Sequence, residues 1–142
     1  MILEASRDTS NSFLNPTDGK KDVFSLEYTG QMLGGSNNFN KLNYDLRRYF
    51  KGFNQQQALV LRMKLGLSKG ELPLKDKYKL GGPQTLRGYD YGEIYGANLS
   101  LFSLEYRLPL YKKINGVLFV DAGNTWENLN KFNIKELKSD IG

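Results

Sequence analysis

The feature that most constrains this chain is an alternation of apolar and polar residues along several segments of strand length. It is clearest in residues 59–68, where every second residue is apolar and the residues between them are mostly charged, polar or small. The apolar set is Leu59, Leu61, Met63, Leu65 and Leu67. A period of two is typical of a β-strand, because successive side chains of a strand point to opposite faces. The segment is also about as long as the 9–11 residues with which a strand crosses a bilayer.

The same alternation recurs along the chain between turn signals. The predicted strands cover residues 23–29, 42–50, 59–68, 102–110 and 117–126, and residues 2–8 are expected to be the end of a further strand. The predicted turns lie at residues 15–19, 34–38, 52–56 and 112–116. Residues 127–140 are expected to form a polar loop with a helical turn at 134–138, before the first step of another strand at Ile141. This order predicts an all-β fold, an antiparallel up-and-down meander of about six strands.

The faces opposite the apolar stripes carry many charges. They are Glu27, Asp45, Arg47, Arg62, Lys64, Glu105, Arg107 and Asp121. A dry core could not hold so many charges without a large desolvation penalty, whereas a water-filled barrel interior could. Aromatic residues near the strand ends fit the interfacial girdles of membrane barrels. The pattern favours the wall of a transmembrane β-barrel, and a soluble β-sandwich binding module with its charges facing solvent is the alternative.

Composition removes several classes of function. The chain has 142 residues, no cysteine and no histidine, so it lacks the groups used by most metal centres and nucleophilic enzymes. Its net charge of +5 comes from lysines scattered over loops and turns, whereas nucleic-acid binding needs them clustered on one face. No apolar run approaches the roughly 18–20 residues of a membrane helix, a finding that is still compatible with a membrane β-barrel. The first ten residues lack a basic region followed by an apolar core, so we expect no signal peptide there. We therefore expect no enzyme, no metal or other cofactor, and no nucleic-acid partner. A glycosidase-like pair of Glu105 and Asp121 is the enzymatic alternative.

One stretch does not alternate. Residues 80–96 read LGGPQTLRGYDYGEIYG, with five glycines and one proline. Glycine supplies backbone freedom, and proline is incompatible with a helix interior or a central strand, so we expect a long loop of defined shape. Arg87 lies at its centre. A guanidinium in the middle of such a loop needs either an anionic partner or a solvated position.

This loop resembles the signature loop of the outer-membrane assembly barrels, the bacterial surface antigen (BamA-type) superfamily. The family pattern is a pair of glycines, then valine or leucine, then Arg-Gly and Phe or Tyr. The matching positions are Gly81, Gly82, Leu86, Arg87, Gly88 and Tyr89. Residues 104–109 and 119–126 resemble the two strands that follow, and the strand pattern Phe-x-Asp-x-Gly falls on Phe119, Asp121 and Gly123. Three motifs in the family's order are far more specific than an Arg-Gly-Tyr triplet alone.

The resemblance implies that the loop, about residues 69–95, folds back into the barrel interior. It also implies that Arg87 meets acidic residues on the two following strands, and the matching acids are Glu105 and Asp121. The alternation independently places both acids on the inward faces. A guanidinium stays charged and offers a planar fork of donors, which two carboxylates on adjacent strands can accept. We therefore interpret Arg87 as a latch that fixes the loop against the strands.

The family barrel has sixteen strands, preceded by periplasmic repeat domains. Residues 1–142 would then be one partial transmembrane barrel domain without such a repeat, a fragment that cannot close a lumen alone. The implied function is that of an assembly factor in the bacterial cell outer membrane, which folds and inserts other outer-membrane proteins without bond chemistry. The implied partners are membrane lipid, client outer-membrane proteins and accessory lipoproteins of an assembly complex. A two-partner secretion polypeptide transporter, which shares these motifs, is the alternative.

Overall fold

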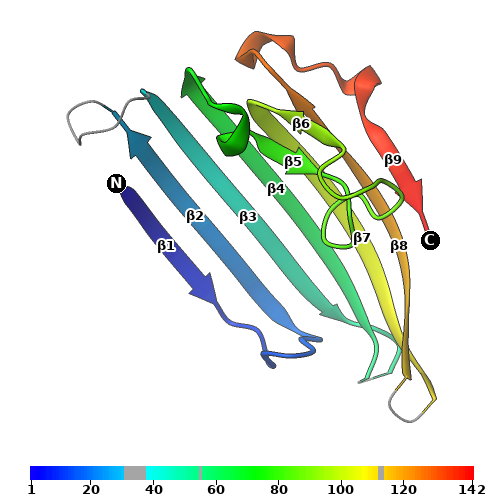
Figure 1. Cartoon of the computed structure of the whole chain (residues 1–142). Coiled ribbons are helices and arrows are strands. Elements are labelled where there is room, and N and C mark those ends of the chain that lie inside the picture. Colours follow the sequence, from blue (N-terminus) through cyan, green and yellow to red (C-terminus); the bar gives the residue numbers. More distant parts are fainter. Residues whose placement is uncertain (31–37, 55, 112–113) are drawn as a thin grey trace.

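The computed structural model describes residues 1–30, 38–54, 56–111 and 114–142. These residues form a main sheet of seven strands in the order β1-β2-β3-β4-β7-β8-β9 (Figure 1). The strands are β1 Ile2–Asp8, β2 Gly19–Thr29, β3 Phe39–Lys51, β4 Ala58–Gly70, β7 Asn98–Tyr111, β8 Ile114–Trp126 and β9 Lys138–Ile141. Each pairs antiparallel with the next. The predicted all-β antiparallel meander is confirmed, and the sheet has one strand more than expected because the segment ending at Ile141 forms a complete pairing with β8.

Four long strands begin three or four residues earlier than their alternation indicates. Among them, β3 begins at Phe39 instead of residue 42, and β7 begins at Asn98 instead of residue 102. β2 begins at Gly19 instead of residue 23, and β8 begins at Ile114 instead of residue 117. In β2 the early part carries charges on both faces, so the backbone pairing with β3 continues where the hydrophobic signal has ended. Gly116, expected in a turn, pairs with Leu108 inside the ladder. Residues 34–37, 55 and 112–113 of the predicted turns lie outside the described residues.

The register gives the sheet an apolar face and a polar face. On the apolar face, called the outer face below, Leu42 lies opposite Leu67. On the polar face, called the inner face, Ser103 lies opposite Asp121. Many outer-face side chains are exposed in this chain, including Phe24, Leu26, Met63, Leu65, Phe102 and Leu118. The described residues thus build one sheet with a largely uncovered apolar face, which argues against a soluble sandwich around a dry core.

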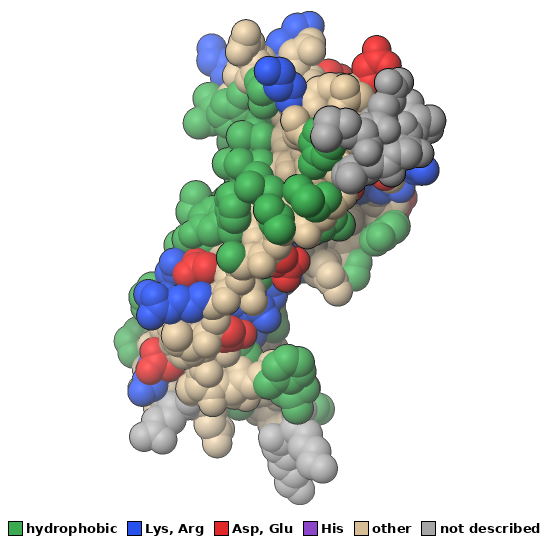
Figure 2. All heavy atoms as spheres, turned by 90° about the vertical axis from the view of Figure 1, so that its left-hand side faces the viewer, with side chains coloured by type: hydrophobic (Ala, Val, Ile, Leu, Met, Phe, Trp, Pro, Cys, Tyr) green, Lys and Arg blue, Asp and Glu red, His purple; other side chains and the backbone are tan. Residues whose placement is uncertain are grey.

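The β1 edge shows how apolar and charged side chains separate along the strands. Seen from that edge, hydrophobic side chains gather in a patch over the upper middle of the molecule, and charged side chains lie above and below this patch (Figure 2). Met1, Ile2 and Leu3 are exposed at the start of β1, and Asp8 at its end pairs with Lys21 at 3.3 Å. In the part of the chain that the structure describes, no helix is long and apolar enough to cross a membrane.

The connection between β4 and β7, residues 71–97, folds over the inner face and is called the lumen loop below. It lies two residues later at each end than the range expected from the sequence. It contains a short 3-10 turn, η2 Leu74–Asp76, and a two-stranded ribbon of β5 Tyr78–Leu80 and β6 Ile94–Gly96. Figure 1 shows this ribbon lying over β4 and β7. The ribbon was not expected, because three-residue strands are too short to show an alternation.

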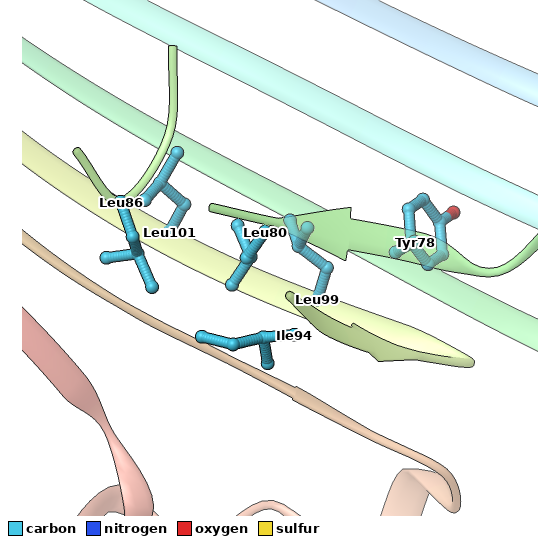
Figure 3. Packing of buried hydrophobic residues seen from close by; sticks show 6 residues of the cluster. All are labelled: Tyr78, Leu80, Leu86, Ile94, Leu99 and Leu101. Atoms are coloured by element: carbon cyan, nitrogen blue, oxygen red, sulfur yellow. The ribbon is translucent and has the colours of Figure 1, made fainter. Parts of the chain in front are cut away.

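An apolar core lies between the lumen loop and the wall. It consists of Tyr78, Leu80, Leu86, Ile94, Leu99 and Leu101 (Figure 3). Burying each such side chain contributes roughly 1.5–3 kcal/mol. Gly66 on β4 makes room for the loop, since a Cβ there would lie 2.6 Å from the Tyr78 ring. The inner face is therefore dry where the loop rests on β7, although the charges on that face had indicated a hydrated interior.

Candidate functional site

Gly81 and Gly82 shape the turn that carries Arg87. Their φ angles are +108° and +94°, in a region that residues with side chains rarely adopt. The Gly82 N–H donates to the carbonyls of Leu86 at 3.1 Å and Tyr89 at 2.8 Å, which closes the turn on itself. A Cβ at Gly81 would collide with the carbonyl oxygen of Asp90. The turn thus requires glycine at Gly81 for both conformation and space.

Arg87 joins the lumen loop to two strands of the wall. Its Nε donates to Oδ2 of Asp121 at 2.8 Å, and its Nη2 donates to Oδ1 of the same carboxylate at 2.9 Å. Nη2 also donates to Oε1 of Glu105 at 3.0 Å. The Asp121 side chain is 0% exposed, and those of Arg87 and Glu105 are 19% and 20% exposed. A two-point ion pair of this kind fixes direction as well as distance. The functional role of these three residues stays a prediction.

Two further side chains complete this cluster. Ser103 Oγ donates to Oδ1 of Asp121 at 2.5 Å and accepts from Nη2 of Arg87 at 3.1 Å. The Arg87 guanidinium carbon lies 3.7 Å from the centroid of the Phe119 ring, in the geometry of a cation–π contact. The sequence analysis singled out Phe119 only as a motif residue, and it missed Ser103. The signal for Ser103 was its inward-facing position on the strand next to Asp121.

Arg107 binds the side of Glu105 that Arg87 leaves open. Its Nε donates to Oε2 of Glu105 at 3.0 Å, and its Nη2 lies 2.9 Å from the same oxygen as an ion pair. Glu105 therefore carries one guanidinium on each carboxylate oxygen. Burial acts to lower the pKa of Arg87, but the hydrogen bonds to Asp121 and the attraction of Glu105 outweigh it, so the pKa of Arg87 is raised. The guanidinium stays charged at any physiological pH.

A second arginine holds the lumen loop from the β4 side. Arg62 Nη1 donates to the Gln84 carbonyl at 2.8 Å, while its Nε and Nη2 donate to Asp45 at 3.1 and 2.6 Å. Arg47 also binds Asp45, with both contacts at 3.3 Å. A polar cavity of about 280 Å³ lies between these arginines and Arg87. The sequence analysis missed this attachment, since its acceptor in the loop is a backbone carbonyl that no side-chain pattern reveals.

The remaining motif residues fix the loop to β9 and to the core. The Gly88 N–H donates to Oδ2 of Asp140 at 2.6 Å, and a Cβ at Gly88 would lie 2.8 Å from the Asp140 Cβ. Tyr89 is partly buried against the apolar core. A Cβ at Gly123 would lie 2.8 Å from the Ser100 carbonyl oxygen, so glycine permits the close approach of β7 and β8 there. The lumen loop is thus attached to five neighbouring strands, β3, β4, β7, β8 and β9, since Lys41 Nζ of β3 also donates to the Asp76 carbonyl at 2.8 Å.

This arrangement is suited to holding a segment in place. Each carboxylate oxygen of Asp121 and Glu105 already accepts a hydrogen bond from an arginine, so both acids are engaged in ion pairs with arginines. Among the described residues, no group of three or more acidic, histidine or cysteine side chains could hold a metal ion. What the geometry provides is a fixed position for the loop on the inner face.

The whole length of the chain matches a known protein family. The Omp85 superfamily domain matches residues 1–141. The chain belongs to the Omp85 superfamily. The resemblance to the outer-membrane assembly barrels is thereby confirmed, and Omp85 membership places the chain among proteins of outer-membrane β-barrel assembly and transport.

Relatives occur in both plants and bacteria. Protein TOC75-4, chloroplastic, from Arabidopsis thaliana is 31% identical over 131 residues, covering 84% of this chain and 32% of that protein. Outer membrane protein assembly factor BamA from Nitratidesulfovibrio vulgaris is 26% identical over 156 residues, covering 96% of this chain and 20% of that protein. A crystal structure of BamA from Haemophilus ducreyi lacking POTRA domains 1–3 superimposes with a TM-score of 0.82 at 19% identity, covering 99% of this chain and 35% of that one. At 19% identity, the similarity to the crystal structure of BamA shows a shared fold.

The chain spans 32% of the length of TOC75-4 and 20% of the length of the BamA from Nitratidesulfovibrio vulgaris. The activity, substrates and partners of a whole Omp85 protein are therefore proposals for this chain. One relative is chloroplastic and another is bacterial. The family is therefore one of outer membranes, and a location in the bacterial outer membrane is a proposal.

Proposed function

We propose that this chain forms part of the wall and the lumen loop of a sixteen-strand β-barrel in the bacterial outer membrane, and that this barrel folds and inserts other outer-membrane proteins. Folding and inserting a client makes and breaks no covalent bond. A barrel of this kind presents sheet edges and a locally disturbed bilayer to an incoming strand. Its partners are membrane lipid, client outer-membrane proteins and accessory lipoproteins.

The observation that carries the proposal is the attachment of the lumen loop to the wall. Arg87 reaches Asp121 on β8 and Glu105 on β7, and Arg62 reaches the loop backbone from β4. These contacts tie adjacent strands together across the inner face. A barrel that opens its sheet at one place to accept a client strand needs the rest of its wall to keep its shape, and a fixed loop supplies that rigidity.

Reconstitution of the intact protein in liposomes tests the proposal. An unfolded client outer-membrane protein is added, and the folded client is measured over time by its protease resistance and gel mobility. We expect the native protein to accelerate client folding over empty liposomes and Arg87→Ala to bring the rate close to that background. Lys75→Ala, at an exposed lysine of the same loop, is the matched control and should keep the native rate. A native protein that leaves client folding at the rate of empty liposomes would rule the proposal out.

The charged inner wall favours a second candidate, a two-partner secretion transporter that moves a polypeptide through the lumen. Asp45, Arg47 and Arg62 line the wall beside the polar cavity, and a hydrated path for an unfolded chain needs such polar walls. The same liposomes separate the two candidates. An assembly factor leaves the client in the bilayer, where it resists extraction with alkaline carbonate. A transporter delivers it into the vesicle interior, where external protease cannot reach it until detergent opens the bilayer.

A further inference from the structure

The connection between β8 and β9, residues 127–137, lies against the outer face and is called the outer flap below. It contains two 3-10 turns, η3 Leu129–Lys131 and η4 Ile134–Glu136. The sequence analysis expected a polar loop, yet Leu129, Phe132 and Ile134 are 50%, 49% and 68% exposed. Phe132 packs edge-on against Trp126 at the end of β8, with ring centroids 5.0 Å apart. The flap therefore presents apolar side chains on the side of the sheet that faces lipid in this family.

An apolar groove of about 320 Å³ lies between the flap and the sheet. Its lining includes Tyr44, Met63, Leu65, Phe102, Phe132 and Leu137. The first four belong to the outer faces of β3, β4 and β7, and the last two belong to the flap. Small-molecule sites are typically grooves of roughly this size with mostly apolar walls. A groove of this character on a lipid-facing surface suits an acyl chain.

Two lysines of the flap have no acidic partner among the described residues. Glu127 is paired with Lys77 at 2.7 Å, and Glu136 accepts from Asn133 at 2.9 Å. Lys131 and Lys135 are exposed and take part in none of the ion pairs found in the described part of the chain. Lysines beside aromatic and apolar side chains are typical of the membrane interface, where the stem lies in the apolar region and the ammonium meets headgroups.

Two buried polar groups beside the groove also lack a partner in the described residues. They are the indole Nε1 of Trp126 and the hydroxyl of Ser100. Ser100 lines the groove, and Trp126 contacts Phe132. Both groups can donate a hydrogen bond, and a buried donor is stabilised by an acceptor. The ester or phosphate oxygens of a lipid, which connect an acyl chain to a charged headgroup, offer such acceptors next to an apolar chain.

We propose that the outer flap and the groove beneath it bind one anionic membrane lipid, with an acyl chain in the groove and the phosphate near Lys131 and Lys135. The occupant is a lipid and not free phosphate, because the groove is lined mostly by apolar side chains and the two unpaired lysines lie on the flap that covers it. The inference goes beyond the proposed function. It depends on the membrane setting of the family and holds whether the barrel inserts clients or transports them.

Trp126, the only tryptophan of the chain, supplies the test. The intact protein is placed in lipid nanodiscs that contain either phosphatidylglycerol or phosphatidylcholine with brominated acyl chains, which quench nearby indoles. The Trp126 signal is the difference between the native protein and Trp126→Phe. We expect half-maximal quenching at a lower fraction of phosphatidylglycerol than of phosphatidylcholine. In Lys131→Gln/Lys135→Gln the preference should fall roughly 30-fold, since each lysine near an anionic surface contributes ~1 kcal/mol.

Matched variants and a competitor make the outcome decisive. Lys75→Gln/Lys79→Gln makes the same charge change at two exposed lysines of the lumen loop, away from the outer face, and should keep the native preference. Phe132→Ala opens the groove and should reduce quenching by both lipids. Equal quenching by the two lipids in the native protein, or the same preference in Lys131→Gln/Lys135→Gln, would overturn the assignment of the headgroup site. Unchanged quenching in Phe132→Ala would overturn the acyl groove, and displacement of the lipid by millimolar inorganic phosphate would overturn the choice of a lipid.

Discussion

Replacing Arg87 by methionine removes the cation from a cluster in which one acid is fully buried. Asp121 is 0% exposed and would keep only the Ser103 hydroxyl as a partner. Breaking a buried ion pair by removing one member destabilises a protein by about 3–5 kcal/mol. Arg87 and Glu105 are 19% and 20% exposed, so water can replace part of what Glu105 loses. We therefore expect the lower end, a fall of about 3 kcal/mol in the free energy of unfolding.

The measurement is urea-induced unfolding of the intact protein in liposomes, followed by tryptophan fluorescence and by the heat-modified gel mobility of the barrel. Asp121→Asn removes the charge that Arg87 would leave behind, so Arg87→Met/Asp121→Asn should be less destabilised than the two single variants together, with a coupling of about 2 kcal/mol. Arg47→Met is the control, because that side chain is 38% exposed and should change stability by less than about 1 kcal/mol. If Arg87→Met matches Arg47→Met and the double variant is simply additive, the ion cluster does not hold the loop.

Three other changes separate the contributions to the loop. Arg62→Gln removes the bond to the Gln84 carbonyl and should raise the rate at which protease cuts the lumen loop several-fold, with the barrel itself intact. Gly81→Ala should destabilise the loop by more than about 2 kcal/mol, because it combines a positive φ with a backbone collision, whereas Gly92→Ala, with φ of +70° and its nearest neighbour at 3.4 Å, should be milder. Burial raises the pKa of the Tyr78 phenol above its ordinary value of 10.0, so the folded protein retains a proton that the unfolded chain loses. Unfolding free energy should therefore decrease as the pH rises above 10, and Tyr78→Phe should lack that part of the decrease.

The five long strands could be predicted from the sequence because each has one apolar and one charged face. A wall between lipid and water imposes that contrast on every residue, so the period of two is strong even without an alignment. The end of β7 nearest the lumen loop carried a different signal. Residues 98–102 read NLSLF, and their alternation puts Leu99 and Leu101 on the inward face. Two inward leucines indicate a strand covered on both sides, and this signal could have revealed the apolar core under the loop.

Only some of the contacts that hold the loop could be predicted from the pattern of charged and apolar residues. Arg87, Glu105 and Asp121 are charged, and a charge that faces inward demands a partner. The bonds of Arg62 to a carbonyl and of Asp140 to a backbone N–H involve groups that every residue possesses, so no pattern marks them. The outer flap was also missed, because its apolar residues are too few and too irregular in spacing to indicate which face of the sheet they cover.

The position of Arg87 also makes the lumen loop sensitive to strand register. Its partners are brought together by the β7–β8 ladder, in which Ser103 lies opposite Asp121 and Glu105 lies opposite Phe119. A slip of one residue in either strand would turn that strand's side chains to the other face. A slip of β8 would turn Asp121 toward lipid, and Arg87 would lose both points of its ion pair with that carboxylate. The loop can therefore dock fully only on a correctly paired wall, so its attachment stabilises the correct register of β7 and β8 against the shifted ones.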